Sequence, residues 1–282
     1  MQLFILNYGV KLIVGFIGFG EVASALTKKL IEGEVEVMTS IKNRSENTKN
    51  LAESSGATFL DSYNELAESS DVLISAVTPS EAINVAENYG TSSKGIFLDL
   101  NNISPMSTRI IADLFDKNND NVSSNFLYPK KNSEKFVKGA IIGKVSSDNS
   151  IIYLSGPEAS KLSFLSDSGL NIKIIGENVE KVAYIKTLRS IYTKGVTAIT
   201  YEAFDFAKEL GLSKELCESL TITEGDKFED LAKSRMKSFD SSRDRKFQEM
   251  DEVLEFLTYL SNEKEFESNF KMIKATRDKF EK

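Results

Sequence analysis

Short apolar runs alternate with amphipathic segments along the first 176 residues of the chain. The runs lie at 12–17, 35–38, 57–59, 71–77, 95–98, 136–145, 151–155 and 171–175. Helical spacing of apolar residues follows the first run and recurs at 46–55, 61–70, 80–89, 107–116 and 158–166. Strands that alternate with helices in this way predict an α/β fold with a doubly wound parallel sheet, whose ligands bind at the carboxyl ends of the strands.

The pattern changes after residue 178, where no strand signal remains and proline is absent. Residues 179–210 keep apolar positions at helical spacing, and three or four charged amphipathic helices follow to residue 282. We therefore predict two domains. Residues 1–176 form the α/β domain, and residues 177–282 form an all-helical domain that begins with one long helix.

The first apolar run ends in the turn Gly18-Phe19-Gly20, which leads directly into a helix. Gly18 allows a tight turn, Gly20 leaves room for a pyrophosphate, and Ala23 lets the helix pack close to the strand. The helix N-terminus offers free N–H groups and a positive dipole end. We interpret this as the turn of a Rossmann-type dinucleotide-binding domain, although similar turns occur in methyltransferases and in sheets that bind nothing. The candidate cofactor contacts are Gly18, Phe19, Gly20, Glu21 and Val22.

The end of the second strand indicates which nicotinamide cofactor fits. An acidic residue there would bind the ribose hydroxyl of NAD, but the strand continues into Lys42, Asn43, Arg44 and Ser45. A guanidinium group suits the 2′-phosphate of NADP, which a carboxylate would repel. We therefore expect NADP rather than NAD, with Asn43, Arg44 and Ser45 in contact with it. The alternative is a solvated loop that carries two basic residues.

Two further segments leave the predicted sheet at the same edge. The central strand 71–77 ends at Val77-Thr78-Pro79, which we expect to contact the cofactor. The next strand ends in a segment that contains Asn101 and Asn102. Because parallel strands share their carboxyl edge, both segments are expected to lie near Gly18.

Composition narrows the chemistry. The net charge of −7 and the pI near 5.0, without a basic stripe, argue against nucleic-acid binding. The single Cys217 excludes an internal disulfide, and the absence of histidine excludes Ser-His-Asp, Cys-His and His-ligated metal chemistry. No segment has the length of a membrane span, and the first ten residues lack the pattern of a secretory leader. We expect a cytoplasmic protein with no metal site and no membrane partner.

The long helix carries a candidate base. Lys186, Ser190 and Lys194 follow one another at helical spacing and so lie on one face. A lysine that is partly desolvated, or that lies beside another cation, can act as a base near neutral pH. The alternative is that these are ordinary exposed helix lysines.

These features occur together in one known family. The glycine turn, the Val77-Thr78-Pro79 exit, the segment 99–105 and the Lys186 helix have the order and spacing found in the β-hydroxyacid dehydrogenase superfamily. The chain resembles that superfamily, which includes 6-phosphogluconate and 3-hydroxyisobutyrate dehydrogenases. Its second half is similar to the short phosphogluconate-dehydrogenase-type C-terminal domain of uncharacterised microbial members.

The resemblance implies a role for several residues. Lys186 would act as general base on a substrate hydroxyl, Ser190 and Asn102 would assist it, and Asn101 and Asn102 stand where relatives carry hydroxyl residues. A Ser-Gly-Gly substrate loop of the family falls on Ile142, Gly143 and Lys144, so its serine is lost but a positive charge is gained. The implied substrate-binding set is Asn101, Asn102, Gly143, Lys144 and Lys194.

The resemblance therefore implies an NADP-dependent oxidoreductase that acts on a small anionic hydroxyacid. Alternatives are an imine reductase on the same fold, which the presence of Lys186 disfavours, and an NADP-binding protein that catalyses nothing. A methyltransferase is disfavoured by the basic loop at 42–44. The apolar surface of the long helix, together with the behaviour of relatives, predicts a homodimer.

Overall fold

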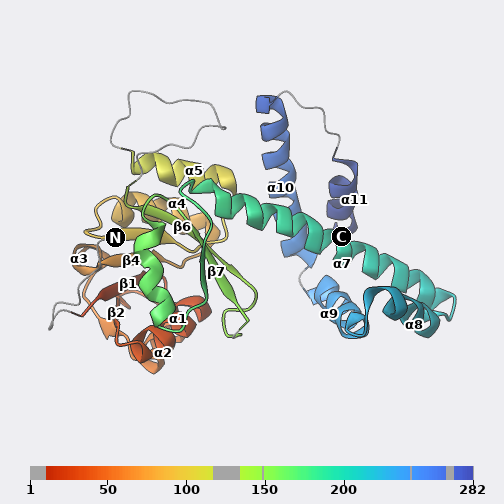
Figure 1. Ribbon diagram of the computed structural model, residues 1–282, viewed down its shortest axis with the longest axis horizontal. Coiled ribbons are helices and arrows are strands. Elements are labelled where there is room, and N and C mark those ends of the chain that lie inside the picture. The colour runs from red at the N-terminus through yellow and green to blue at the C-terminus, as the bar shows by residue number, and fades with distance from the viewer. Residues whose placement is uncertain (1–10, 117–133, 148, 242, 265–269, 282) are drawn as a thin grey trace. The chain divides into compact units, whose positions relative to one another are not determined.

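The computed structural model describes residues 11–116, 134–147, 149–241, 243–264 and 270–281 (Figure 1). The chain divides into two compact units, Met1–Tyr184 and Ile185–Lys282. The division falls within the long helix α7 (Glu180–Glu209), so that one helix begins in the first unit and continues in the second.

Eight strands in the described part of unit 1 form a single sheet in the order β3-β2-β1-β4-β5-β6-β7-β8 (Figure 1). All neighbouring strands are parallel except β6 and β7, which form an antiparallel pair. This confirms the predicted α/β fold with its largely parallel sheet. The strands are β1 (Ile13–Ile17), β2 (Glu36–Thr39), β3 (Thr58–Phe59), β4 (Val72–Ser75), β5 (Ile96–Asp99), β6 (Phe136–Ile142), β7 (Ile151–Ser155) and β8 (Ile172–Ile174).

Helices connect most of these strands. They are α1 (Glu21–Glu32), α2 (Glu46–Ser55), α3 (Tyr63–Ser69), α4 (Ala82–Val85), α5 (Pro105–Leu114) and α6 (Phe164–Asp167). The segment 80–89 was expected to be one α-helix, but it begins with a 3₁₀ turn, Pro79–Glu81, and ends in a π turn, Ala86–Gly90. Segment 158–166 likewise begins as the 3₁₀ helix Ala159–Ser163. Apolar spacing does not distinguish these tighter and wider turns from an α-helix.

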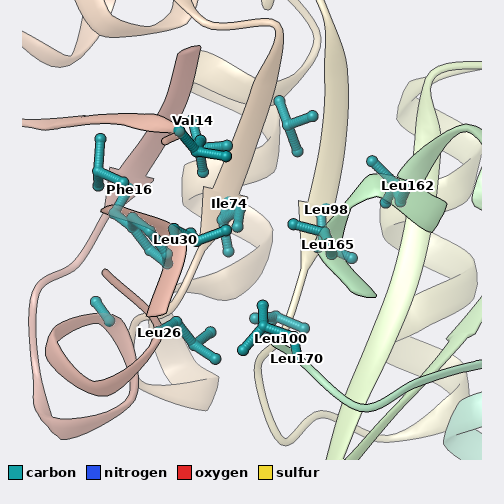
Figure 2. Close-up of a cluster of buried hydrophobic side chains, with 14 of the residues drawn as sticks. Val14, Phe16, Leu26, Leu30, Ile74, Leu98, Leu100, Leu162, Leu165 and Leu170 are labelled. Carbon is teal, nitrogen blue, oxygen red and sulfur yellow. The ribbon is translucent and has the colours of Figure 1, made fainter. Parts of the chain in front are cut away.

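The sheet is buried on both faces, as the near-continuous apolar runs predict. Side chains at alternate positions, such as Val14, Phe16 and Ile74, pack with α1, α2 and α6 on one face (Figure 2). On the other face, residues such as Leu73 and Phe97 pack with α3, α4 and α5. Because helices cover both faces, a ligand can reach the strands only at an edge of the sheet. The loops that follow the parallel strands lie at its carboxyl edge.

Unit 2 is helical throughout its described residues. Its helices are the continuation of α7, then α8 (Ser213–Glu224), α9 (Phe228–Ser241), α10 (Arg243–Lys264) and α11 (Lys271–Lys279). Phe239 and Phe280 lie at its centre, 1% exposed each, and the ring of Tyr201 stacks on Phe239. Among the described helices of both units, none combines the length and apolar character that crossing a membrane requires.

Candidate active site

The strand order reverses between β1 and β4, and the two strands leave the sheet side by side. Gly18, directly after β1, has a φ of +85°, which favours glycine. A Cβ at Gly18 would lie 2.5 Å from the carbonyl oxygen of Ala76 and 2.6 Å from Cγ1 of Val77. The glycine therefore lets the turn after β1 lie directly against the exit of β4, at the point where such sheets bind ligands.

Gly20, unlike Gly18, lies beside open space. It is the N-cap of α1, no side chain caps that helix end, and a Cβ placed on Gly20 would meet no atom within 4 Å. The first turn of α1 therefore presents backbone N–H groups beside open space, the arrangement that binds a phosphate group.

The side chains of Phe19 and Val22 pack against the core of unit 1. The Phe19 side chain is 3% exposed and packs edge-to-face on Phe16, with ring centroids 6.0 Å apart. Val22 is partly buried against the same core. The Phe19 side chain therefore leaves only its backbone groups at the turn, whereas Val22 is half-buried and Glu21 is exposed in the first turn of α1.

The basic loop after β2 is held by a tyrosine. Arg44 is exposed, its Nε donates to the hydroxyl of Tyr63 over 3.0 Å, and its guanidinium lies 5.2 Å from the centre of that ring. Asn43 adopts a φ of +59°. The Ser45 hydroxyl caps α2 by accepting from the Thr48 N–H, so Ser45 is partly used within the protein. The loop thus carries an oriented cation, in addition to the exposed Lys42.

Asn101 does not lie on the surface of the site. Its side chain is 3% exposed, its Oδ1 accepts from the Val77 N–H over 2.7 Å, and its Nδ2 donates to Ser75 and Asp99. The Asn101 amide is therefore buried and hydrogen-bonded within the protein, whereas the sequence predicted a contact with substrate. Asn102, which follows it, is exposed. Thr78 and Pro79 are exposed as well, whereas Val77 is half-buried.

The hairpin of β6 and β7 carries the other predicted substrate residues of unit 1. Lys138 of β6 pairs in register with Asp99 at the end of β5, and β6 continues for four more residues. Gly143, with a φ of +96°, and the exposed Lys144 follow on the turn. These two residues therefore lie well beyond the ends of β4 and β5.

In unit 2, Lys186, Ser190 and Lys194 lie on α7 at the helical spacing that the sequence predicts. The Lys194 ammonium donates to the Ser190 hydroxyl over 3.2 Å and pairs with Glu249 of α10 at 2.5 Å. Lys194 is 8% exposed, so its charge is largely neutralised within the helical unit. Lys186 lies two turns earlier and is half-buried. Burial, reinforced by the Arg245 and Lys194 cations, lowers the pKa of the neighbouring Lys246.

Sequence reasoning did not identify three residues that organise these groups. Tyr63 anchors Arg44, Glu249 pairs with Lys194, and Lys138 forms a buried ion pair with Asp99. Each lies far from its partner along the chain, so only the fold brings it into contact. The one available signal was a charged residue, Lys138, within an apolar strand run.

Comparison with known proteins places the fold. The family model "NADP oxidoreductase coenzyme F420-dependent" matches residues 13–102. An uncharacterised 28.5 kDa protein of Methanothermus fervidus, encoded in the 5′ region of 7S RNA, is 42% identical over 270 residues, which cover 95% of this chain and 97% of that protein.

Solved structures with the same fold include proteins related to 3-hydroxyacid dehydrogenases. The conserved protein MTH1747, of unknown function and structurally similar to 3-hydroxyacid dehydrogenases, is 36% identical over 95% of both chains, with a TM-score of 0.76. A Mycobacterium tuberculosis 3-hydroxyisobutyrate dehydrogenase, solved with L-serine, shares the fold at 13% identity, with a TM-score of 0.73 over 96% of this chain and 93% of that one. The chain belongs to the β-hydroxyacid dehydrogenase superfamily of NAD(P)-dependent oxidoreductases.

Proposed function

We propose that this protein is an NADP-dependent oxidoreductase that moves a hydride between the nicotinamide and a small anionic hydroxyacid or its keto form. The observation that carries the proposal is the carboxyl edge of β1 and β2. There the uncapped start of α1 faces open space at Gly20, and Arg44 is oriented by Tyr63. The two features correspond to the pyrophosphate and the 2′-phosphate of one ligand.

The residues of unit 1 fit that cofactor. Gly18 and Gly20, with the backbone of Phe19, Glu21 and Val22, would hold the pyrophosphate. Lys42, Asn43 and Arg44 would hold the 2′-phosphate, with Ser45 fixing the start of α2 beside it. The exit of β4 at 77–79 would lie along the remaining half of the dinucleotide.

The cofactor, when bound, supplies the hydride acceptor or donor. On the protein side, Lys186 takes the proton from the substrate hydroxyl, and Ser190 donates a hydrogen bond to a substrate oxygen. The Lys194 ammonium, which Glu249 neutralises, orients Ser190 rather than binding substrate itself. Asn102 and Lys144 are exposed and available to an anionic substrate.

The cofactor proposal is tested by titration with NADPH and NADH, read by nicotinamide fluorescence. Arg44→Ala is expected to weaken NADPH binding by about 1–3 kcal/mol and to leave NADH binding nearly unchanged, because only NADPH carries the 2′-phosphate. Tyr63→Phe should produce a smaller loss of the same kind, since Arg44 keeps its ring contact but loses the hydroxyl.

Lys94→Ala is the matched control. Lys94 pairs with Asp71 at 3.6 Å, and the two residues lie just before β5 and β4 begin. The substitution therefore removes one positive charge from the amino edge of the sheet, opposite the edge that carries Arg44. Equal losses for Arg44→Ala and Lys94→Ala, or equal losses of NADPH and NADH binding, would contradict the 2′-phosphate assignment.

The reaction is tested by a panel of small hydroxyacids and keto acids, with Lys186→Ala beside the wild-type protein. Turnover that depends on Lys186 supports the proposal. Reduction of cyclic imines without hydroxyacid turnover would instead identify an imine reductase. NADP binding without turnover of either panel would identify a binding protein.

A further inference from the structure

Three polar side chains interrupt the apolar core of unit 1 at one level of the sheet. Ser75, Asp99 and Lys138 stand in register on β4, β5 and β6, each 0–1% exposed. The residues two positions before them, Leu73, Phe97 and Phe136, belong to the apolar face covered by α3 and α5. The polar row therefore lies at the end of this apolar face, next to the carboxyl ends of the strands.

The lysine in this row is fully bonded. Its ammonium donates to Oδ2 of Asp99 over 2.6 Å, to the carbonyl oxygen of Asn101 over 2.7 Å and to the carbonyl oxygen of Asp99 over 3.3 Å. Since an ammonium has three N–H donors, none is left for another partner. Lys138 thus fixes both the Asp99 carboxylate and the backbone that leaves β5.

The contacts continue from β5 to β4. Oδ1 of Asp99 accepts from the backbone and side-chain N–H groups of Asn101. The Asn101 amide in turn donates to Ser75 over 2.8 Å and accepts from the Val77 N–H over 2.7 Å. One chain of hydrogen bonds therefore runs from β6 through the loop after β5 to the loop after β4.

Stability alone does not explain a buried ion pair. Removing two charges from water costs several kcal/mol, and apolar residues of similar size often serve the fold equally well. The Lys138–Asp99 pair instead determines where two loops at the sheet edge lie. Both loops emerge on the β4–β5 side of β1, whereas Arg44 lies on the β2 side.

We propose that Lys138, Asp99 and Asn101 are positioning residues that shape the loops after β4 and β5 for the nicotinamide half of the dinucleotide. This inference rests on the NADP-binding function proposed above. With the 2′-phosphate on the β2 side and the pyrophosphate at α1, the nicotinamide half extends across β4 and β5. The buried relay therefore acts on that half and not on the adenosine half.

Binding of a cofactor fragment distinguishes effects on the adenosine half of NADPH from effects on its nicotinamide half. Adenosine 2′,5′-bisphosphate carries the 2′-phosphate but no nicotinamide, so its affinity reports the Arg44 side alone. The double variant Asp99→Asn with Lys138→Met removes one charge of each sign and keeps the core volume. We expect NADPH affinity to fall by about tenfold or more, while affinity for the fragment stays within about twofold of the wild type.

Leu66→Ala is the control for general loosening. Leu66 is fully buried on the same face of the sheet and takes part in none of the relay's hydrogen bonds, so its truncation lowers stability through a cavity. It should leave the ratio of NADPH to fragment affinity unchanged. If the double variant does not fold, Asn101→Ala, which keeps the ion pair and cuts the link to Val77, should show the same selective loss.

An unchanged ratio in the double variant, or in Asn101→Ala where the double variant does not fold, would overturn the inference and leave the NADP-binding function intact. Loss of both ligands in proportion in a folded relay variant would also overturn it. Wild-type protein that binds neither NADPH nor the fragment would instead overturn the proposed function.

Discussion

At the scale of single residues, two glycines of one turn differ in what an added methyl group would meet. At Gly18 it would lie against the backbone of the neighbouring strand exit, in a conformation that L-residues rarely adopt. At Gly20 it would meet only open space, and the φ of −100° is accessible to alanine. One glycine is therefore required by the fold, and the other leaves space for a ligand.

This contrast gives a matched pair of variants. Gly18→Ala should lower the free energy of unfolding by at least about 1 kcal/mol, because the methyl group is both strained and crowded. Gly20→Ala should keep that free energy within about 0.5 kcal/mol and weaken NADPH and NADH alike, because the methyl group occupies the space for the pyrophosphate. Thermal unfolding and fluorescence titration measure the two effects. Unchanged nucleotide affinity in Gly20→Ala would place the pyrophosphate elsewhere.

The sequence predicted the glycine turn well because its reason is local. A strand, two glycines and a helix lie within the twenty residues 13–32, and the structure places Gly18 and Gly20 as that pattern requires. Asn101 was assigned to the surface because the strand edge was predicted but not the partners of its amide. Residues whose environment depends on distant strands, such as Asn101, need the fold before their role can be assigned.

At the scale of elements, apolar spacing located most strands and helices but not their finer geometry. The run 136–145 and the run 151–155 became β6 and β7, yet their antiparallel pairing depends on the short turn between them rather than on either run. The segment 80–89 was helical but not uniformly α. Periodicity fixes which face is buried, whereas turn length and hydrogen-bond register fix the rest.

The link between α7 and α10 is a second feature that spacing did not predict. Lys194 and Glu249 pair with side chains 10% and 27% exposed, so the carboxylate is held mainly by the protein. Glu249→Gln would leave the buried ammonium with the Ser190 hydroxyl and a neutral amide. We expect a loss of about 1–3 kcal/mol in the free energy of unfolding, measured with urea.

Glu218→Gln provides the comparison on the same type of element. Its partner in α8 is Lys214, and both side chains are more than 60% exposed, so the same substitution should cost less than about 0.5 kcal/mol. Equal effects of the two substitutions would mean that the Lys194–Glu249 pair is no more than a surface contact.

At the largest scale, α7 carries large apolar side chains that the described residues leave exposed. Leu188, Tyr192, Ile199 and Phe206 are each 61–69% exposed. The last three are seven residues apart, so they form one stripe along the helix. A stripe with this repeat is suited to pair with an identical stripe, because a twofold axis brings the same residues of two helices together.

We therefore expect a homodimer that buries this stripe. In size-exclusion chromatography with light scattering, the wild-type protein should elute as a dimer. Tyr192→Glu with Ile199→Glu should elute as a monomer, because two carboxylates on each helix would have to be desolvated against apolar side chains. The monomer's unit 1 should still unfold cooperatively on heating, since both substituted positions lie in unit 2 and are exposed.

Ile110→Glu, at a 47% exposed position of α5, is the control and should remain dimeric. A wild-type monomer at every accessible concentration would show that the stripe does not pair with itself, and dissociation by Ile110→Glu alone would move the interface to unit 1.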